Sequence, residues 1–257
     1  MSKESFVIRS LRVLCLTAFI AALSFAATAQ QLTVSAAASL TNAFNDLAPK
    51  FEAMKPGVKL RFNYAASGVL LQQVQQGAPV DVFASADQAT VARGIEQKVF
   101  DADTRRDFAR NTVVLIAPAE GASFVTSLQA LEAPSVKRIA IGKTATVPVG
   151  RYTQEVLEAA GLWSVLAPKF VQADTVRQVL DYVSRGEADA GFVYRTDAAI
   201  AGDKVRIVLT AQGHTPVTYP IVVVSDSRQK ALARDFIAFL ATPPAVEVLA
   251  RYGFGAP

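Results

Sequence analysis

The sequence predicts an α/β protein of two lobes, each a mixed sheet flanked by helices, with a ligand cleft between the lobes. Short β-rich apolar runs alternate with helical patterns throughout the chain after residue 29, as is typical of parallel or mixed sheets. Two extended segments, Asn111–Pro118 and Leu209–Val224, lack an obvious helix on one side. We interpret them as crossings between lobes, which assigns residues 30–110 and 215–257 to lobe I and 111–214 to lobe II.

The alternation is read from apolar runs with β-branched residues for strands and from helical spacing of apolar residues for helices. The predicted strands are Leu32–Ala36, Lys59–Tyr64, Val80–Ser85, Thr112–Ala117, Arg138–Ile141, Lys169–Gln172, Ala190–Tyr194, Val205–Leu209 and Tyr219–Val224. The predicted helices are Thr41–Lys55, Gly68–Gln76, Asp87–Gln97, Thr104–Arg110, Gly150–Ala160, Thr175–Arg185 and Arg228–Ala241.

Residues 1–29 have the pattern of a cleavable signal peptide. Basic residues precede an uncharged apolar run, Val13–Phe25, and Ala27–Ala29 supplies the small residues of a cleavage site before Gln30. The run is shorter than the roughly 20 residues of a membrane-spanning helix. The single cysteine, Cys15, lies in this run without a lipobox before it. We therefore expect an exported, unlipidated chain without thiols, which suits an oxidising compartment.

The charge of the exported chain does not indicate a polyanionic partner. Removing three basic residues and one acidic residue with residues 1–29 lowers the formal net charge from +4 to +2. The remaining basic residues are scattered and do not alternate with aromatic residues, as they would along a nucleic-acid groove. The sequence predicts no binding to DNA, RNA or a membrane surface.

Small residues and a serine lie at the junctions between several predicted strands and the helices that follow them. Ala37, Ala38 and Ser39 follow the first strand, and Ser67 follows the second. Small residues let a ligand approach the backbone, and a helix start offers unpaired N–H groups and the positive end of its dipole to an anion. The alternative is ordinary capping, for which Ser67 and Asp174 suit N-cap positions and Pro148 suits a first turn.

Enzymatic motifs are incomplete in this sequence. A serine triad needs a histidine, and the only one, His214, stands in a Gly/Pro-rich segment without a G-x-S-x-G motif elsewhere. Gly142-Lys143-Thr144 resembles the end of a phosphate-binding loop, but Lys137 stands where its first glycine belongs. His, Cys and carboxylates lack metal-ligand spacing. We predict no catalytic residue.

Four further side chains have a structural interpretation on their own. We expect Asp87 to cap the helix that follows it, and Trp163 and Phe170 to pack in a core. Tyr194 ends its strand at the edge where the cleft would lie. Taken alone, it too is assigned a structural role.

The motifs together resemble the periplasmic molybdate-binding proteins of bacterial ABC-type molybdate uptake systems. The resemblance runs from Leu32 to Phe254. It is carried by AAASLTNA at 36–43, GAPVDVF at 77–83, SADQ at 85–88, VPVG at 147–150, DTVR at 174–177, GFVY at 191–194 and RYGF at 251–254. It implies the type II periplasmic-binding-protein fold and a function in carrying molybdate, and tungstate with it, to a membrane transporter.

The resemblance also implies which residues bind the oxyanion. Ser39 and Ser67 would donate through hydroxyl and backbone N–H groups from lobe I. From lobe II, Val149 and Val176 would donate backbone N–H groups and Tyr194 its phenol. Molybdenum would be held only as molybdate through these residues, without a cofactor.

The remaining implications concern partners, location and two departures from the family. We expect a periplasmic monomer that serves an inner-membrane ABC permease with its cytoplasmic ATPase. Val149 replaces a frequent alanine, and Lys143–Thr146 replaces an acidic segment of some members; Lys143 would raise the on-rate or alter selectivity. Two alternatives stay open, namely a receptor for sulfate, phosphate or an organic anion, and an exported hydrolase.

Overall fold

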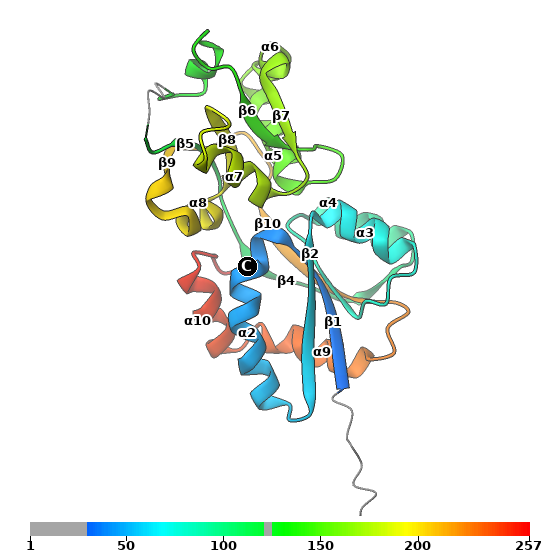
Figure 1. Cartoon of the computed structure of the whole chain (residues 1–257). Helices are drawn as coiled ribbons and strands as arrows, with labels where there is room; N and C mark the ends of the chain where they lie inside the picture. Colours follow the sequence, from blue (N-terminus) through cyan, green and yellow to red (C-terminus); the bar gives the residue numbers. More distant parts are fainter. Residues whose placement is uncertain (1–29, 121–124) are drawn as a thin grey trace, which may run out of the picture. The chain divides into compact units, whose positions relative to one another are not determined.

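The strands form two five-stranded sheets in the computed structural model, which describes residues 30–120 and 125–257 (Figure 1). The first sheet has the order β2-β1-β3-β10-β4 and the second the order β7-β6-β8-β5-β9. The first contains β1 Gln30–Ala37, β2 Val58–Ala65, β3 Val82–Ala84, β4 Phe100–Arg110 and β10 Thr218–Val224. The second contains β5 Val113–Pro118, β6 Ile139–Gly142, β7 Phe170–Ala173, β8 Ala190–Tyr194 and β9 Val205–Thr210. The predicted signal peptide lies outside the described residues.

Helices connect most of the strands. The α-helices are α2 Thr41–Met54, α3 Ser67–Gln75, α4 Gln88–Glu96, α5 Pro148–Ala159, α6 Trp163–Leu166, α7 Val176–Ser184, α8 Arg195–Ala201, α9 Lys230–Phe239 and α10 Pro243–Arg251. Short 3-10 turns are η1 Ala38–Leu40, η2 Gln129–Glu132, η3 Ala167–Lys169 and η4 Gly202–Lys204. None of the helices in the described part of the chain is long and apolar enough to cross a membrane.

Both sheets are mixed, as the sequence predicts. In the first sheet β1 and β3 are parallel, whereas β10 runs antiparallel to β3 and β4. In the second sheet β6 is parallel to β7 and β8, whereas β5 runs antiparallel to β8 and β9. The parallel strands bring the starts of the helices that follow them to one edge of each sheet.

Helices pack on the first sheet through two separate apolar clusters. One cluster joins α3 and α4 to the sheet and includes Leu70, Leu71, Val91 and Phe83. The other cluster contains Phe44 of α2 and Phe236 of α9, whose rings meet edge to face with centroids 5.9 Å apart. Burial of such side chains stabilises the fold by about 1.5–3 kcal/mol each, so the helices and their starts are held firmly.

The prediction of a helix at Thr104–Arg110 is wrong, because this segment belongs to strand β4. Its buried residues Phe100, Thr104 and Phe108 are spaced four apart, which imitates a helical face. That spacing arises because the pairing of β4 with β10 contains two register shifts, beside Pro220 and beside Val223. Bulges of this kind break the strict alternation by which a strand is recognised. Helices α6, α8 and α10 were not predicted.

Sheet membership changes twice along the chain. The chain leaves the first sheet after Arg110, enters the second at Val113, leaves it after Thr210 and returns at Thr218. Residues Gln31–Pro257 form one compact unit. We propose the division into lobe I (30–110 and 215–257) and lobe II (111–214), which the sheet membership supports, and use these names below.

Candidate functional site

A small cavity brings together all five residues that the sequence assigns to oxyanion binding. Its volume is about 10 Å³, close to the least that holds one water molecule. The five, Ser39, Ser67, Val149, Val176 and Tyr194, are each less than 5% exposed. The remaining lining consists of small or apolar side chains, namely Ala37, Ala38, Ala65, Ala66, Ala86, Val147 and Pro148.

Each of the five residues stands at the end of a strand or the start of a helix. Ser39 lies in η1 between β1 and α2, and Ser67 is the first residue of α3. Val149 and Val176 occupy the first turns of α5 and α7, and Tyr194 is the last residue of β8. The first N–H groups of a helix have no acceptor within it and carry partial positive charge. Elements of both lobes therefore present donors to one cavity.

The predicted caps are partly confirmed. Asp87 caps α4, because its carboxylate accepts the N–H of Thr90, and Pro148 opens α5. The predictions for Ser67 and Asp174 are wrong. Residue Ala66 occupies the N-cap of α3 without a side-chain bond, and Thr175 caps α7 through the N–H of Gln178 at 3.1 Å. The Ser67 hydroxyl is thus not used for capping.

The three hydroxyl groups at the cavity differ in their partners. The Ser67 hydroxyl oxygen accepts the N–H of Ala86 at 3.1 Å, and the Ser39 oxygen lies 3.0 Å from the Tyr219 hydroxyl. Among the described residues the Tyr194 hydroxyl has no hydrogen-bond partner, although it is buried. Burial raises the pKa of Tyr194 well above its usual value, so this phenol keeps its proton. An unpaired buried hydroxyl is costly, which points to a ligand as its partner.

Charged side chains surround the cavity without lining it. Arg177 of α7 donates to the Ser39 carbonyl at 3.3 Å and the Asn42 side chain at 3.0 Å, and pairs with buried Asp197 at 2.6 Å. Arg151 of α5 donates from Nε to Asp87 at 2.9 Å. Both arginines reach from lobe II to lobe I. Neither arginine was expected at the site from the sequence, although Arg177 lies within the DTVR motif.

The remaining residues considered from sequence lie elsewhere. Lys143 is not part of the lining. Its positive charge is partly offset by an ion pair with Asp174. Trp163 and Phe170 are half-buried and pack with ring centroids 4.7 Å apart. His214 contacts the Tyr152 ring rather than the cavity. Residues 30–120 and 125–257 contain no cluster of His, Cys, Asp or Glu that could hold a metal ion.

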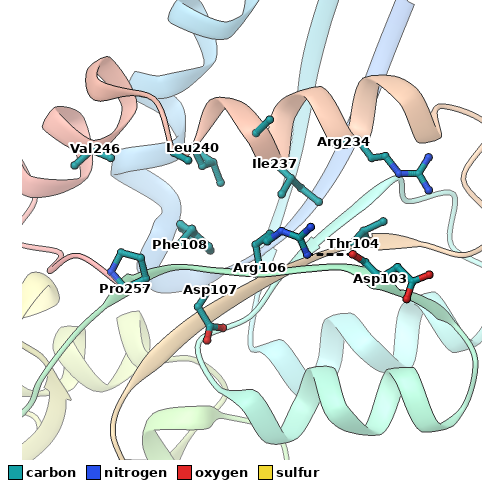
Figure 2. Close-up of a pocket in the computed structure, with 12 residues that line it drawn as sticks. Asp103, Thr104, Arg106, Asp107, Phe108, Arg234, Ile237, Leu240, Val246 and Pro257 are labelled. Atoms are coloured by element: carbon teal, nitrogen blue, oxygen red, sulfur yellow. Dashed lines mark hydrogen bonds between the residues drawn. The ribbon is translucent and has the colours of Figure 1, made fainter.

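A larger cavity, about 530 Å³, lies between β4 and the helices α9 and α10 (Figure 2). Ile237, Leu240 and Val246 give it an apolar wall, and Arg106 on its other side donates to the Asp103 carbonyl at 3.0 Å. None of the five predicted site residues lines it. Its polar groups are exposed or already paired, whereas the small cavity holds the hydroxyl of Tyr194, which is buried and unpaired among the described residues.

Two mixed sheets whose helix starts meet at one cavity are typical of a class, the solute-binding proteins of two α/β lobes. Residues 32–255 match the family described as bacterial extracellular solute-binding protein, and the chain belongs to this family. Proteins of this class carry a ligand for transport rather than a cofactor.

Relatives and solved structures agree with this assignment. The chain is 37% identical to the molybdate-binding protein ModA of Escherichia coli over 91% of this chain and 95% of the relative. It is 37% identical to the substrate-binding domain of a putative molybdenum ABC transporter from Clostridium difficile, with a TM-score of 0.67 over 88% and 99% of the two chains. The periplasmic molybdate-binding protein of Azotobacter vinelandii shares the fold, with 24% identity and a TM-score of 0.78 over 88% and 99%.

Proposed function

We propose that the protein binds molybdate, and tungstate with it, in the periplasm and delivers it to an ABC permease in the inner membrane. The supporting observation is the convergence of neutral donors from both lobes on one cavity without a charged residue in its lining. Relatives named as molybdate-binding proteins, at 35–37% identity, support this choice of ligand. The site would consist of Ser39, Ser67, Val149, Val176 and Tyr194.

The energetics of such a site suit a small dianion. Hydrogen bonds to a charged group contribute about 1.5–3 kcal/mol each, and the five residues supply about seven donors. Association costs about 4–15 kcal/mol, so the sum can reach the roughly −8 kcal/mol of micromolar affinity when the bonds lie toward the strong end of their range and the cost toward its low end. Because every donor is fixed to a helix start or a strand end, a smaller anion such as sulfate would not contact all of them. Selectivity would therefore follow from size.

Location and partners follow from the same proposal. The predicted signal peptide would direct export and be removed before Gln30, which leaves a monomer in the periplasm. Closure of the two lobes around the ligand would present a single surface to the permease, whose ATPase lies in the cytoplasm. Closure of two lobes is a recognised means of signalling occupancy.

Calorimetric titration of the purified exported chain tests the ligand. We expect molybdate and tungstate to bind with similar affinity and sulfate to bind far more weakly. Tight binding of sulfate, phosphate or an organic anion instead would favour the alternative receptor. Failure of all oxyanions together with turnover of ester substrates would favour an exported hydrolase.

Alanine substitution tests the site. Ser39→Ala and Ser67→Ala should each weaken molybdate binding by roughly tenfold or more, since each removes a charge-assisted hydrogen bond. The control is Ser135→Ala, at an exposed position outside the lining, which should bind as the wild type does. Unchanged affinity in both site variants would contradict the assignment.

A further inference from the structure

Asn111, in the crossing between β4 and β5, has an amide whose orientation is fixed by the backbone. Its Oδ1 accepts the N–H of Thr112 at 2.9 Å. The amide nitrogen must therefore point the other way, where it lies 2.9 Å from the Thr196 hydroxyl and 3.2 Å from the Tyr219 hydroxyl. A flipped amide would place its NH₂ against the Thr112 N–H. Asn111 is thus a donor to Tyr219.

The hydrogen bond from Asn111 also sets the direction of the hydrogen bond between Tyr219 and Ser39, which lines the cavity. Its phenol oxygen accepts from Asn111, so its own proton is available for its other neighbour, the Ser39 oxygen at 3.0 Å. The Tyr219 side chain is fully buried, and burial raises the pKa of its phenol well above the usual value. Tyr219 therefore keeps its proton, and its O–H donates a hydrogen bond to the Ser39 oxygen, the only other partner of this hydroxyl among the described residues.

The Ser39 oxygen accepts this hydrogen bond, so the Ser39 O–H must point to a different acceptor. No bond from the Ser39 O–H to another acceptor is found in the described part of the chain, and Ser39 lines the cavity. The Ser67 oxygen likewise accepts a hydrogen bond, from the N–H of Ala86. Both serines therefore face the cavity as donors.

We propose that Asn111 and Tyr219 are positioning residues that fix the Ser39 hydroxyl as a donor and so favour oxyanions without a proton. This inference rests on the proposed function. A protonated oxyanion such as hydrogen phosphate would place its O–H against a donor at either serine, and no carboxylate in the lining accepts it. Neither positioning residue lines the cavity, so both act through Ser39.

A double-mutant cycle isolates this effect from general damage. Molybdate affinity is measured calorimetrically for the wild type, Ser39→Ala, Tyr219→Phe and the double variant. Tyr219→Phe should weaken binding roughly three- to tenfold, the range of one ordinary hydrogen bond. In the Ser39→Ala background it should have no further effect, because the hydroxyl that it orients is gone. The same change combined with Ser67→Ala should be additive, which is the matched control.

A second readout tests selectivity. Without the Tyr219 proton, Ser39 is free to accept, so phosphate, which is protonated at neutral pH, should compete better with molybdate in Tyr219→Phe than in the wild type. Asn111→Ala should shift affinity and competition in the same directions by a smaller factor. If a melting experiment shows that Tyr219→Phe does not fold, Asn111→Ala tests the positioning role in its place.

The outcomes separate this inference from the proposed function. A wild type that binds no molybdate would overturn both. A wild type that binds, with loss of affinity in Ser39→Ala, supports the site. If Tyr219→Phe and Asn111→Ala then have no effect, or act equally with and without Ser39, the positioning role alone is overturned.

Discussion

At the scale of single residues, the hydroxyls at the cavity are distinguished by what already occupies their oxygens. The Ser39 and Ser67 oxygens are engaged by protein groups, whereas the Tyr194 hydroxyl has no partner among the described residues. An unpaired buried polar group costs stability unless a ligand satisfies it. Tyr194 is therefore the side chain at which stability and binding oppose each other most directly.

Replacing Tyr194 by phenylalanine should separate these two effects. We expect molybdate affinity to fall by roughly tenfold or more, while the ligand-free protein unfolds at an equal or higher temperature, because the variant removes an unsatisfied hydroxyl. Calorimetry and thermal unfolding measure the two quantities. Tyr252→Phe, at an exposed hydroxyl bonded to Asp46, is the control for affinity. A destabilised ligand-free Tyr194→Phe with normal affinity would contradict this account.

At the scale of elements, the sequence allowed most strands and helices to be predicted within a few residues. Strand β4, part of which was predicted as a helix, shows the physical limit. Its buried positions recur every fourth residue because bulges interrupt its pairing with β10, and pairing with a strand more than a hundred residues away leaves no local signal. Helix α10 was missed although Pro243 begins it, a signal that could have been used.

The residues that line the candidate site could be predicted from the sequence, but the residues behind them could not. The resemblance and the small residues at Ala37–Ser39 and Ala65–Ser67 led to residues that do line one cavity. Asn111 and Tyr219 could not be found in this way, because they lie in a crossing and in the middle of a sheet. Their significance appears only once the fold places the Tyr219 hydroxyl beside Ser39.

Helices α7 and α8 are joined by a buried ion pair that should make stability depend on pH. Asp197 is fully buried with Arg177 Nε at 2.6 Å. Burial raises the pKa of Asp197 to about 6, against the lowering effect of Arg177. The folded pKa thus lies above the unfolded value of 3.8. The stability that the folded state gains by holding a proton on Asp197 is therefore complete below pH 3.8 and is lost as the pH rises through about 6.

Comparison with Asp197→Asn should reveal this contribution. We expect the stability of the wild type relative to the variant to fall by about 2 kcal/mol as the pH rises from about 4 to about 6.5. Denaturant unfolding at a series of pH values measures it. Asp226→Asn, at an exposed position, should run parallel to the wild type. A wild type and Asp197→Asn that remain parallel over this range would show that Asp197 does not titrate there.

At the scale of the whole molecule, contacts between the lobes surround the cavity. The N–H of Gly68 donates to the Thr146 carbonyl at 2.9 Å, and the Arg151–Asp87 and Arg177–Asn42 contacts add side-chain links. Gly68 has no room for a side chain, since a Cβ would lie 2.7 Å from the Thr146 carbonyl oxygen. The approach of the two lobes at this point depends on glycine.

Gly68→Ala should therefore hold the lobes apart. Because the obstacle is backbone, it cannot yield by a rotamer change, and we expect molybdate affinity to fall by roughly tenfold or more through faster dissociation. Stopped-flow release measures this rate, and small-angle scattering should report a more open liganded protein. Gly255→Ala, whose Cβ would meet only Arg110 at an ordinary 3.6 Å, is the control. Equal release rates in both variants would contradict the proposed closure contact.

The helix starts at Val149 and Val176 have a consequence for how the site tolerates mutation. In the proposed site these two positions contribute main-chain N–H groups, which every amino acid except proline supplies. A codon change there alters the bulk beside the anion but leaves the donor in place. The serines are different, because a single base substitution can delete their hydroxyls. Inherited variation would thus adjust the fit of the anion at Val149 and Val176 and weaken its binding at Ser39 and Ser67.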